Sequence, residues 1–309
     1  MIVIGAGMAG LLAAAMLRSE CTQVVEKQRS LPNNHSAVLR FRSSIVADTL
    51  NIPFQPVDVL KSIHPWRNPV ADAMAYSLKT NGTSTLRSIV SANGMIERRY
   101  IAPQNLIGRM ASCVSSPISF DISFGKDDLR ALDEPIISTI PMPALMGILG
   151  WRDVPEFNFR DGTNIAVSLD DVNAYCSLYI PDPGYKFSRI SITGSEMVIE
   201  CGGTQEAGTA LLRLGDTNSI VREAGYLCGI HPRRIGDPIT TKQPYSKILP
   251  IDDHVRKRFM LWATEKHNVY SLGRFATWRP GLLLDDVVND VRTIHRMVHG
   301  GTTYEGRKS

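Results

Sequence analysis

The sequence has few of the residues that build disulfide frameworks, metal centres or membrane spans. Its 309 residues include five scattered cysteines, none of them in a Cys-x-x-Cys pair. This scatter disfavours a secreted disulfide scaffold and predicts reduced thiols in a cytoplasmic protein. No His-Glu-x-x-His motif or Cys/His cluster occurs, so we expect no metal site. No run approaches the roughly 20 apolar residues of a membrane span, so we expect no membrane partner.

An excess of one charge is also lacking. The chain has 34 lysines and arginines against 30 acidic residues, a formal net charge of +4, and 43% hydrophobic residues. This composition is ordinary for a globular protein, and the length allows one large domain or two interleaved ones. The small positive excess permits an anionic substrate or nucleic acid but does not require either.

A short apolar run followed by three glycines opens the chain. Residues 2–4 predict a buried parallel strand, and Gly5, Gly7 and Gly10 follow at once. The first glycine allows a tight turn, the second lets the backbone approach a pyrophosphate, and the third lets a helix pack on the strand. The helix "LLAAAMLRSE" would point its N-terminal amides at the phosphates. The run lacks the basic residues of a signal peptide.

A second strand, "TQVVEK", ends in an acidic residue. It places Glu26 about 20 positions after the first glycine, the spacing expected for a carboxylate that binds ribose hydroxyls. An acid here disfavours the 2′-phosphate of NADP. The order of strand, glycines, helix, strand and acid predicts a dinucleotide site, and the alternative is a glycine-rich turn in an unrelated α/β domain.

The C-terminal part favours FAD over NAD. The stretch "NVYSLGRFATWRPGLLLDDVVNDVRTIHRM" predicts a short strand over 269–272, a Gly-Arg turn, an irregular loop and a long helix. Val287, Val291 and Ile294 fall at helical spacing on one face. The N-terminus of such a helix can point at the flavin pyrimidine and stabilise negative charge on the reduced ring.

These paired ends resemble flavoproteins of the glutathione-reductase-like fold, in the branch that holds amine oxidases and UDP-galactopyranose mutase. The stretch "GRFATWR" is similar to the mutase signature, and "EPIISTIPMPALM" resembles the strand by which that branch re-enters the FAD domain. The resemblance implies an α/β fold, with a Rossmann-like FAD-binding domain built on a parallel sheet. It also implies an interleaved substrate domain with a mainly antiparallel sheet, to which the alternating stretches between 150 and 250 are suited.

The same resemblance implies the cofactor-binding residues. They are Gly5, Ala6, Gly7, Met8, Ala9 and Gly10 of the glycine turn, Glu26 and Lys27 at the ribose, and Gly273, Arg274, Leu283, Leu284 and Asp285 near the C-terminus. The family usually has a Gly-Gly pair where the chain passes the flavin, and residues 33–36, "NNHS", replace it here.

Three residues are candidates for catalysis. His35 lies in the segment that should pass the flavin, so it could touch the flavin or the substrate. Lys247 could place a water near flavin N5, as a lysine does in some amine oxidases. Trp278 lies beside the flavin loop and could form a wall of the site. For each of them a purely structural or surface role is the alternative.

Three arginines are candidates for binding the substrate. Arg40 and Arg42 alternate with Leu39 and Phe41, so both should point to one face of an extended segment. Their planar forks suit a carboxylate or phosphate, and a solvated face or an ion pair is the alternative. Arg279 joins them because it lies in the loop beside the flavin.

The order of these elements predicts a discontinuous two-domain organisation. The FAD-binding domain should comprise residues 1–45, 86–145 and 255–300, the substrate domain residues 46–85 and 146–254, and a flexible tail residues 301–309.

The function that the resemblance implies is oxidation by an FAD-dependent oxidoreductase or lyase, at an amine C–N bond. The stretches "HSAVLRFRSS" and "YSLGRFATW" also resemble small flavoproteins of bacterial viruses, some of which trim an amino acid from modified thymidine in viral DNA. DNA is therefore a possible substrate. Two alternatives stay open, a flavin-dependent isomerase like UDP-galactopyranose mutase and a flavin-binding protein without turnover. The sequence leaves the oligomeric state and the electron acceptor undetermined.

Overall fold

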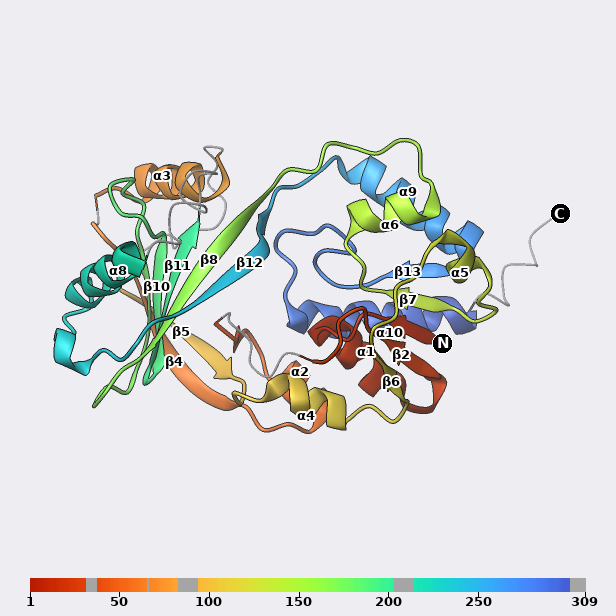
Figure 1. The fold of residues 1–309 in the computed structure, drawn as a ribbon, viewed down its shortest axis with the longest axis horizontal. Coiled ribbons are helices and arrows are strands. Elements are labelled where there is room, and N and C mark those ends of the chain that lie inside the picture. The colour runs from red at the N-terminus through yellow and green to blue at the C-terminus, as the bar shows by residue number, and fades with distance from the viewer. Residues whose placement is uncertain (32–37, 66, 83–93, 203–213, 301–309) are drawn as a thin grey trace.

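The computed structural model describes residues 1–31, 38–65, 67–82, 94–202 and 214–300. Two lobes lie side by side, each built on one sheet (Figure 1). Sheet A has five parallel strands in the order β13-β7-β1-β2-β6. Their bounds are Ile2–Ile4 for β1, Gln23–Val25 for β2, Ile118–Ser119 for β6, Ile136–Ser138 for β7 and Val269–Ser271 for β13.

Helices cover both faces of sheet A, because its short strands are apolar on both sides. Val3 points to a core formed with α1 (Met8–Leu17), α4 (Leu106–Ser112) and α10 (Leu284–Gly300). Ile2 and Ile4 point to the opposite core. That second core is completed by α5 (Lys126–Arg130), α6 (Met142–Leu149) and α9 (Asp253–His267).

Sheet B has eight strands in the order β12-β8-β11-β10-β9-β4-β5-β3. Their bounds are Arg40–Phe41 for β3, Gln55–Ile63 for β4, Met95–Ile101 for β5, Phe159–Ser168 for β8, Ala174–Tyr179 for β9, Arg189–Gly194 for β10, Glu196–Gly202 for β11 and Ile239–Ile248 for β12. Neighbouring strands are antiparallel, except that β4 and β9 are parallel.

One face of sheet B is apolar and the other is polar, as strand alternation requires. The apolar face packs on α8 (Leu214–Leu227), which lies on the side of the sheet away from the other lobe (Figure 1). The opposite face is therefore turned towards sheet A, and we call it the polar face. Its charged residues include Arg40, Lys61, Glu97, Arg99, Arg160, Arg189, Glu196, Glu200 and Lys247. Helix α3 (Pro69–Asn81) packs beside the end of this sheet through Tyr76 and Tyr179.

The predicted fold class is confirmed, since a helix-covered parallel sheet is joined to a mainly antiparallel one. Sheet membership divides the chain differently from the predicted boundary at residue 86. Residues 95–101 form β5 and pair with β4 in sheet B, and the chain returns to the sheet A lobe with α4, which packs on α1. This long pairing register could not be read from the isolated segment.

Three further predictions concern membrane spans, disulfide bonds and a flexible tail. No helix of the described residues is long and apolar enough to cross a membrane. All five cysteines are free. The predicted tail 301–309 lies outside the described residues. The remaining short elements are α2 (Ile45–Leu50) and the 3₁₀ turns Arg18–Glu20 (η1) and Pro232–Arg234 (η2).

Candidate cofactor and substrate site

The glycine turn is packed so closely that two of its glycines are obligatory. Gly5 has a φ of +98°, and a Cβ built there would lie 2.0 Å from Thr139 Oγ1. A Cβ on Gly10 would lie 1.8 Å from the carbonyl oxygen of Gly5. Thr139 itself is fixed because its amide and its hydroxyl both donate to the carbonyl of Ile4, each at 2.9 Å. The turn therefore brings α1 directly against β1 and β7.

Gly7, in contrast, faces open space. A Cβ built on it would meet no atom within 4 Å. Gly7 is the N-cap residue of α1. It has no side chain that could accept a hydrogen bond from the first helical amides, and the first turn contains no acidic residue. The first amides of α1, from Met8 onwards, thus have no side-chain acceptor at the N-cap, and the first turn itself contains no carboxylate to offset the helix dipole. A helix N-terminus of this kind binds phosphate.

Glu26 lies beside this turn, at the end of β2. Its Oε2 accepts a hydrogen bond from the Ala6 amide at 2.7 Å, and its Oε1 accepts one from the Gln28 amide at 2.9 Å. A carboxylate has about four acceptor positions, so further donors can still be bound. The neighbouring Lys27 is exposed. The backbone therefore holds the Glu26 carboxylate at the same edge of sheet A as the glycine turn.

The C-terminal segment meets the N-terminal turn at this edge. Gly273 follows β13 with a φ of +90°, and a Cβ on it would lie 2.9 Å from the Cβ of Ala9 in α1. Leu272 donates its amide to the carbonyl of Ser138 at 2.9 Å, which continues the β13–β7 pairing to this point. The carboxyl ends of parallel strands meet at one edge, where open α/β sheets bind their ligands.

Several buried polar atoms at this edge have no hydrogen-bond partner among the described residues. Two of them are Nε of Arg274 and Oδ2 of Asp285. Burial lowers the pKa of the Arg274 guanidinium. The other oxygen of Asp285, Oδ1, accepts from the amide and the hydroxyl of Ser43 at 2.9 and 2.8 Å. Buried polar groups are rarely left unsatisfied, so these two atoms indicate a ligand at this position.

Helix α10 begins at the same place. The Leu283 amide donates to Oδ2 of Asp286 at 2.9 Å, a contact that fixes the start of the helix before Leu284. The N-terminal end of α10 points towards sheet B (Figure 1). The residues predicted at 283–285 thus lie at the end of α10 that faces the sheet B lobe, and their contact with a flavin stays a prediction.

The polar face of sheet B supplies ionic groups opposite this edge. Arg189 is paired with Glu200 on the neighbouring strand, and Glu97 binds both Lys61, at 2.5 Å, and Arg99. Two carboxylates therefore serve three cations. Because further cations of this face, Arg40 and Lys247 among them, make no ion pair with a described residue, this face carries an excess of positive charge.

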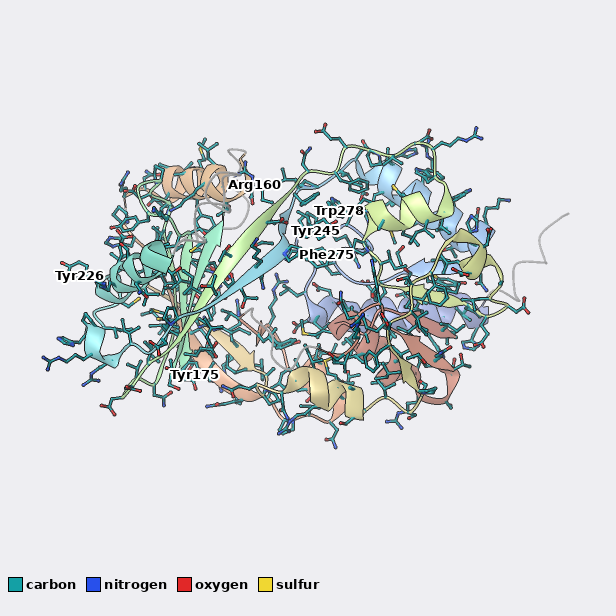
Figure 2. The ribbon with its side chains drawn as sticks, in the orientation of Figure 1. Arg160, Tyr175, Tyr226, Tyr245, Phe275 and Trp278 are labelled. Carbon is teal, nitrogen blue, oxygen red and sulfur yellow. The ribbon has the colours of Figure 1, made fainter. Side chains whose placement is uncertain are left out.

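Lys247 is close enough to this charge for its pKa to respond. Burial lowers the pKa of the ammonium, and Arg189 and Arg274 lower it further, while Glu200 opposes them. Because Arg274 lies at the carboxyl edge of sheet A and lowers the pKa of Lys247, this part of the polar face is near that edge. Lys247 and Glu200 also line a small cavity with Arg160, which Figure 2 labels on β8.

Arg40 does not present its guanidinium to a ligand as predicted. Its NH1 donates to Ser177 Oγ at 2.8 Å, and its other nitrogens donate to Thr193 Oγ1 and to the carbonyls of Cys176 and Ile192. Burial lowers its pKa to about 10. These contacts fasten β3 to β9 and β10, whereas Arg42 lies just beyond the strand and is exposed. The two arginines therefore do not act as one anion-binding pair in this structure.

We expect Arg40→Lys to destabilise the protein and Arg42→Lys to leave it unchanged. A lysine cannot reproduce the planar fork that reaches four acceptors, and losing hydrogen bonds to a charged group costs roughly 1.5–3 kcal/mol. An exposed substitution such as Arg42→Lys should stay within about 0.5 kcal/mol. Urea denaturation of both variants measures the difference. Equal stabilities would show that the Arg40 contacts contribute nothing.

Trp278 and Arg279 are held within the protein. Trp278 is 1% exposed, donates its indole N–H to the carbonyl of Leu249 at 2.9 Å and packs against Tyr245. Figure 2 shows both, with Phe275, between β12 and the sheet A lobe. Arg279 donates to Thr277 Oγ1 at 3.0 Å and forms an ion pair with Asp290. Trp278 therefore belongs to the buried core, and we do not assign it to the proposed site.

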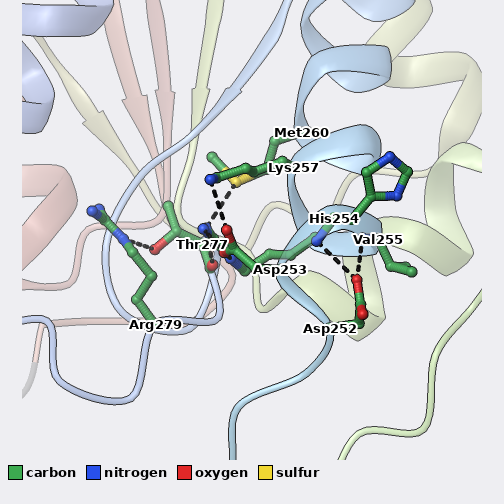
Figure 3. Close-up of polar contacts among 9 residues, drawn as sticks. Asp252, Asp253, His254, Val255, Lys257, Met260, Thr277 and Arg279 are labelled. Atoms are coloured by element: carbon green, nitrogen blue, oxygen red, sulfur yellow. Dashed lines mark hydrogen bonds and ion pairs between the residues drawn. The ribbon is translucent and has the colours of Figure 1, made fainter.

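The loop that carries these two residues is anchored to α9 (Figure 3). Asp252 caps α9 by accepting from the amides of His254 and Val255 at 2.8 and 3.0 Å. Arg256 then reaches from α9 to the carbonyl of Thr277 at 3.2 Å. This anchoring fixes the segment between β13 and α10 that borders the site.

His35 lies outside the described residues, so its predicted role stays a prediction.

Sequence reasoning missed the paired charges of the polar face. In "SRISITG" and "MVIEC" the alternation predicts strands but does not pair Arg189 with Glu200. That pair exists because β10 and β11 place these two residues directly opposite each other. The signal available in the sequence was that Arg189 and Glu200 each fall on the strand face opposite the apolar residues.

Comparison with known proteins supports the fold. No protein-family model matches the chain, and no curated protein matches it. A solved reduced UDP-galactopyranose mutase is similar with a TM-score of 0.72 and 11% identity, over 98% of this chain and 94% of that one. An oxidoreductase from Methanosarcina mazei has a TM-score of 0.60 and 12% identity, over 96% and 99% of the chains. Aklavinone-11 hydroxylase, solved with FAD and aklavinone, has a TM-score of 0.56 and 12% identity, over 97% and 62%.

Proposed function

We propose that this protein is an FAD-dependent enzyme of the oxidoreductase type that acts on an anionic substrate. The observation that carries the proposal is the meeting of two distant segments at the carboxyl edge of sheet A. There the contact of Gly273 with Ala9 joins the open phosphate-binding turn to the unsatisfied Arg274 and Asp285. A dinucleotide has a charged pyrophosphate in its middle and polar groups at both ends, which matches the order of these protein groups along the edge.

Each end of the site has residues suited to one part of FAD. The amides of α1 and the space beside Gly7 would hold the pyrophosphate, and Glu26 would bind the hydroxyls of the adenosine ribose. Nε of Arg274 and Oδ2 of Asp285 would bind polar groups towards the flavin. When bound, FAD would supply reversible two-electron chemistry.

The polar face of sheet B would bind and orient the substrate. Lys247, Arg99 and Arg274 present positive charge towards the space between the lobes, and long-range attraction to such a surface concentrates anions. Because its pKa is lowered by burial, Lys247 releases a proton more readily than an exposed lysine does. Lys247 is therefore the residue that we propose to hold or move a proton beside the cofactor.

A sugar nucleotide is the first candidate substrate, with an isomerisation like that of UDP-galactopyranose mutase. The mutase similarity extends along nearly the whole of both chains, and the "GRFATWR" signature lies where the two lobes meet. The basic polar face suits a diphosphate.

An amine on an amino-acid-modified thymidine in DNA is the second candidate, with oxidation of its C–N bond. Lys247 favours it, because a lysine serves near the flavin in some amine oxidases. The basic face would then bind DNA phosphates.

One experiment separates the two candidates. Purified protein is incubated with UDP-galactofuranose under reducing conditions and, separately, with DNA carrying a glycyl-modified thymidine. Formation of UDP-galactopyranose supports the isomerase, and release of a keto acid such as glyoxylate supports the amine oxidation. For the DNA candidate, log affinity must also fall steeply with log salt concentration, because phosphate contacts release counterions.

Glu26→Gln should weaken FAD binding at least tenfold while the protein stays folded. Charge-assisted hydrogen bonds to the ribose hydroxyls are worth roughly 1.5–3 kcal/mol, which corresponds to about tenfold or more in affinity. Glutamine keeps an oxygen for the Ala6 amide, so the turn should persist. FAD titration of deflavinated protein measures the change, with Glu265→Gln, an exposed carboxylate on α9 of the same lobe, as the control. Unchanged affinity would show that Glu26 does not bind the ribose.

A further inference from the structure

Two histidines and a glutamate converge at the end of the sheet A lobe opposite the proposed cofactor site. Glu20 belongs to η1, which follows α1, and His295 and His299 lie one turn apart on α10. Nε2 of His295 is 2.9 Å from Oε1 of Glu20, and Nε2 of His299 is 2.6 Å from Oε2. The two imidazole centroids are 4.5 Å apart. The three side chains thus form one cluster.

We propose that Glu20, His295 and His299 bind a divalent transition-metal ion such as Zn²⁺. One nitrogen or oxygen atom from each lies within 4.8 Å of the other two. Zinc binds histidine nitrogen and carboxylate oxygen at about 2.0–2.2 Å, so ligand atoms around a tetrahedral ion lie roughly 3.3 Å apart. The present N–O distances of 2.9 and 2.6 Å are shorter than this separation, and rotation of the side chains can lengthen them to it.

The chemistry of the three groups also suits a metal. Two histidines at positions i and i+4 share one helix face, the spacing by which helices hold zinc. The side chains are 39%, 41% and 55% exposed, which leaves room for water to complete the coordination. Two neutral imidazoles and one carboxylate would form a common zinc donor set.

The site is independent of the proposed function. Its ligands come from the end of α1 and the C-terminal half of α10, whereas the opposite ends of both helices border the proposed cofactor site. A bound ion would fasten these two helix ends together. Metal binding should therefore raise the melting temperature whether or not FAD is present.

Isothermal titration calorimetry of untagged protein with Zn²⁺ tests the proposal, with thermal melting as a second readout. We expect one ion per chain and a higher melting temperature. His295→Ala and His299→Gln should each weaken binding at least about tenfold, because even changes to residues that only support metal ligands cost 10–100-fold. Glu20→Gln should also weaken it, since an amide is a poorer ligand than a carboxylate.

His254→Ala is the matched control, because His254 is an exposed helical histidine outside the cluster. It should bind Zn²⁺ as the wild type does. The cysteines can bind the same metal, so the comparison between variants decides the assignment. If the wild type takes up no ion, or if the double variant His295→Ala/His299→Ala binds equally well, the cluster is only a set of hydrogen bonds. Melting without metal checks that each variant is folded.

Discussion

Replacing Gly7 with aspartate should abolish FAD binding without unfolding the protein. The position has a φ of −71° and a ψ of 175°, which any residue adopts, and its Cβ would meet no atom within 4 Å. Aspartate is also a good N-cap, so α1 should be no less stable. Its carboxylate would nevertheless accept the amides that we assign to the pyrophosphate, and it would repel that group. We expect FAD affinity to fall by about 100-fold or more, the effect of roughly 2.7 kcal/mol.

Gly10→Ala provides the contrasting variant. Its Cβ would lie 1.8 Å from the Gly5 carbonyl oxygen, so α1 would have to move away from β1. Stability and FAD binding should then be lost together. Melting temperature and FAD titration, measured on both variants, distinguish the two outcomes. Retention of FAD by Gly7→Asp would contradict the placement of the pyrophosphate.

Glu200→Ala should destabilise the protein by about 3 kcal/mol, since removing one partner of a buried ion pair leaves an uncompensated charge. The Arg189 and Glu200 side chains are only 28% and 18% exposed. Burial alone would raise the pKa of the Glu200 carboxyl, but Arg189 and Lys247 outweigh it and lower the pKa. The matched control is Glu196→Ala on the same strand, because Glu196 is exposed and should tolerate the change within about 0.5 kcal/mol.

The contribution of Glu200 should depend on pH in one direction. A carboxyl whose pKa is lower in the folded than in the unfolded protein stabilises the fold above the unfolded pKa, about 4.3 for glutamate. That stabilisation is lost as the pH falls through the folded pKa. The difference in unfolding free energy between wild type and Glu200→Ala should therefore be constant near pH 7 and shrink below about pH 4. Urea denaturation at several pH values measures it. A difference that grows in acid would contradict the account.

The strands, glycine turn and helix at the proposed cofactor edge could be predicted from the sequence because their signals are local. Strand, glycine turn, helix and Glu26 follow one another within the first 26 residues, and each conformational demand falls on neighbouring residues. The C-terminal Gly-Arg turn and helix are equally local. Only the meeting of the two ends, through Gly273 and Ala9, needed the fold, and the resemblance had implied it.

Contacts between distant strands and helices could not be predicted in the same way. The sequence suggests that Arg40 is half of an exposed pair, yet its guanidinium is enclosed because it reaches Ser177 of β9 and Ile192 of β10. Glu20 lies 275 positions from His295 in the chain, so no spacing rule connects them. In both cases the alternation of residues places side chains on a face, but only tertiary packing decides what lies opposite that face.

The most direct test of the account is the identity of the cofactor that the purified protein carries. The protein is expressed, its visible absorption spectrum is recorded, and any cofactor is released by denaturation and identified by mass spectrometry. The account predicts a yellow protein that releases FAD in a one-to-one ratio, or an apoprotein that takes up FAD on titration. A colourless protein that binds NAD and ignores FAD would contradict it.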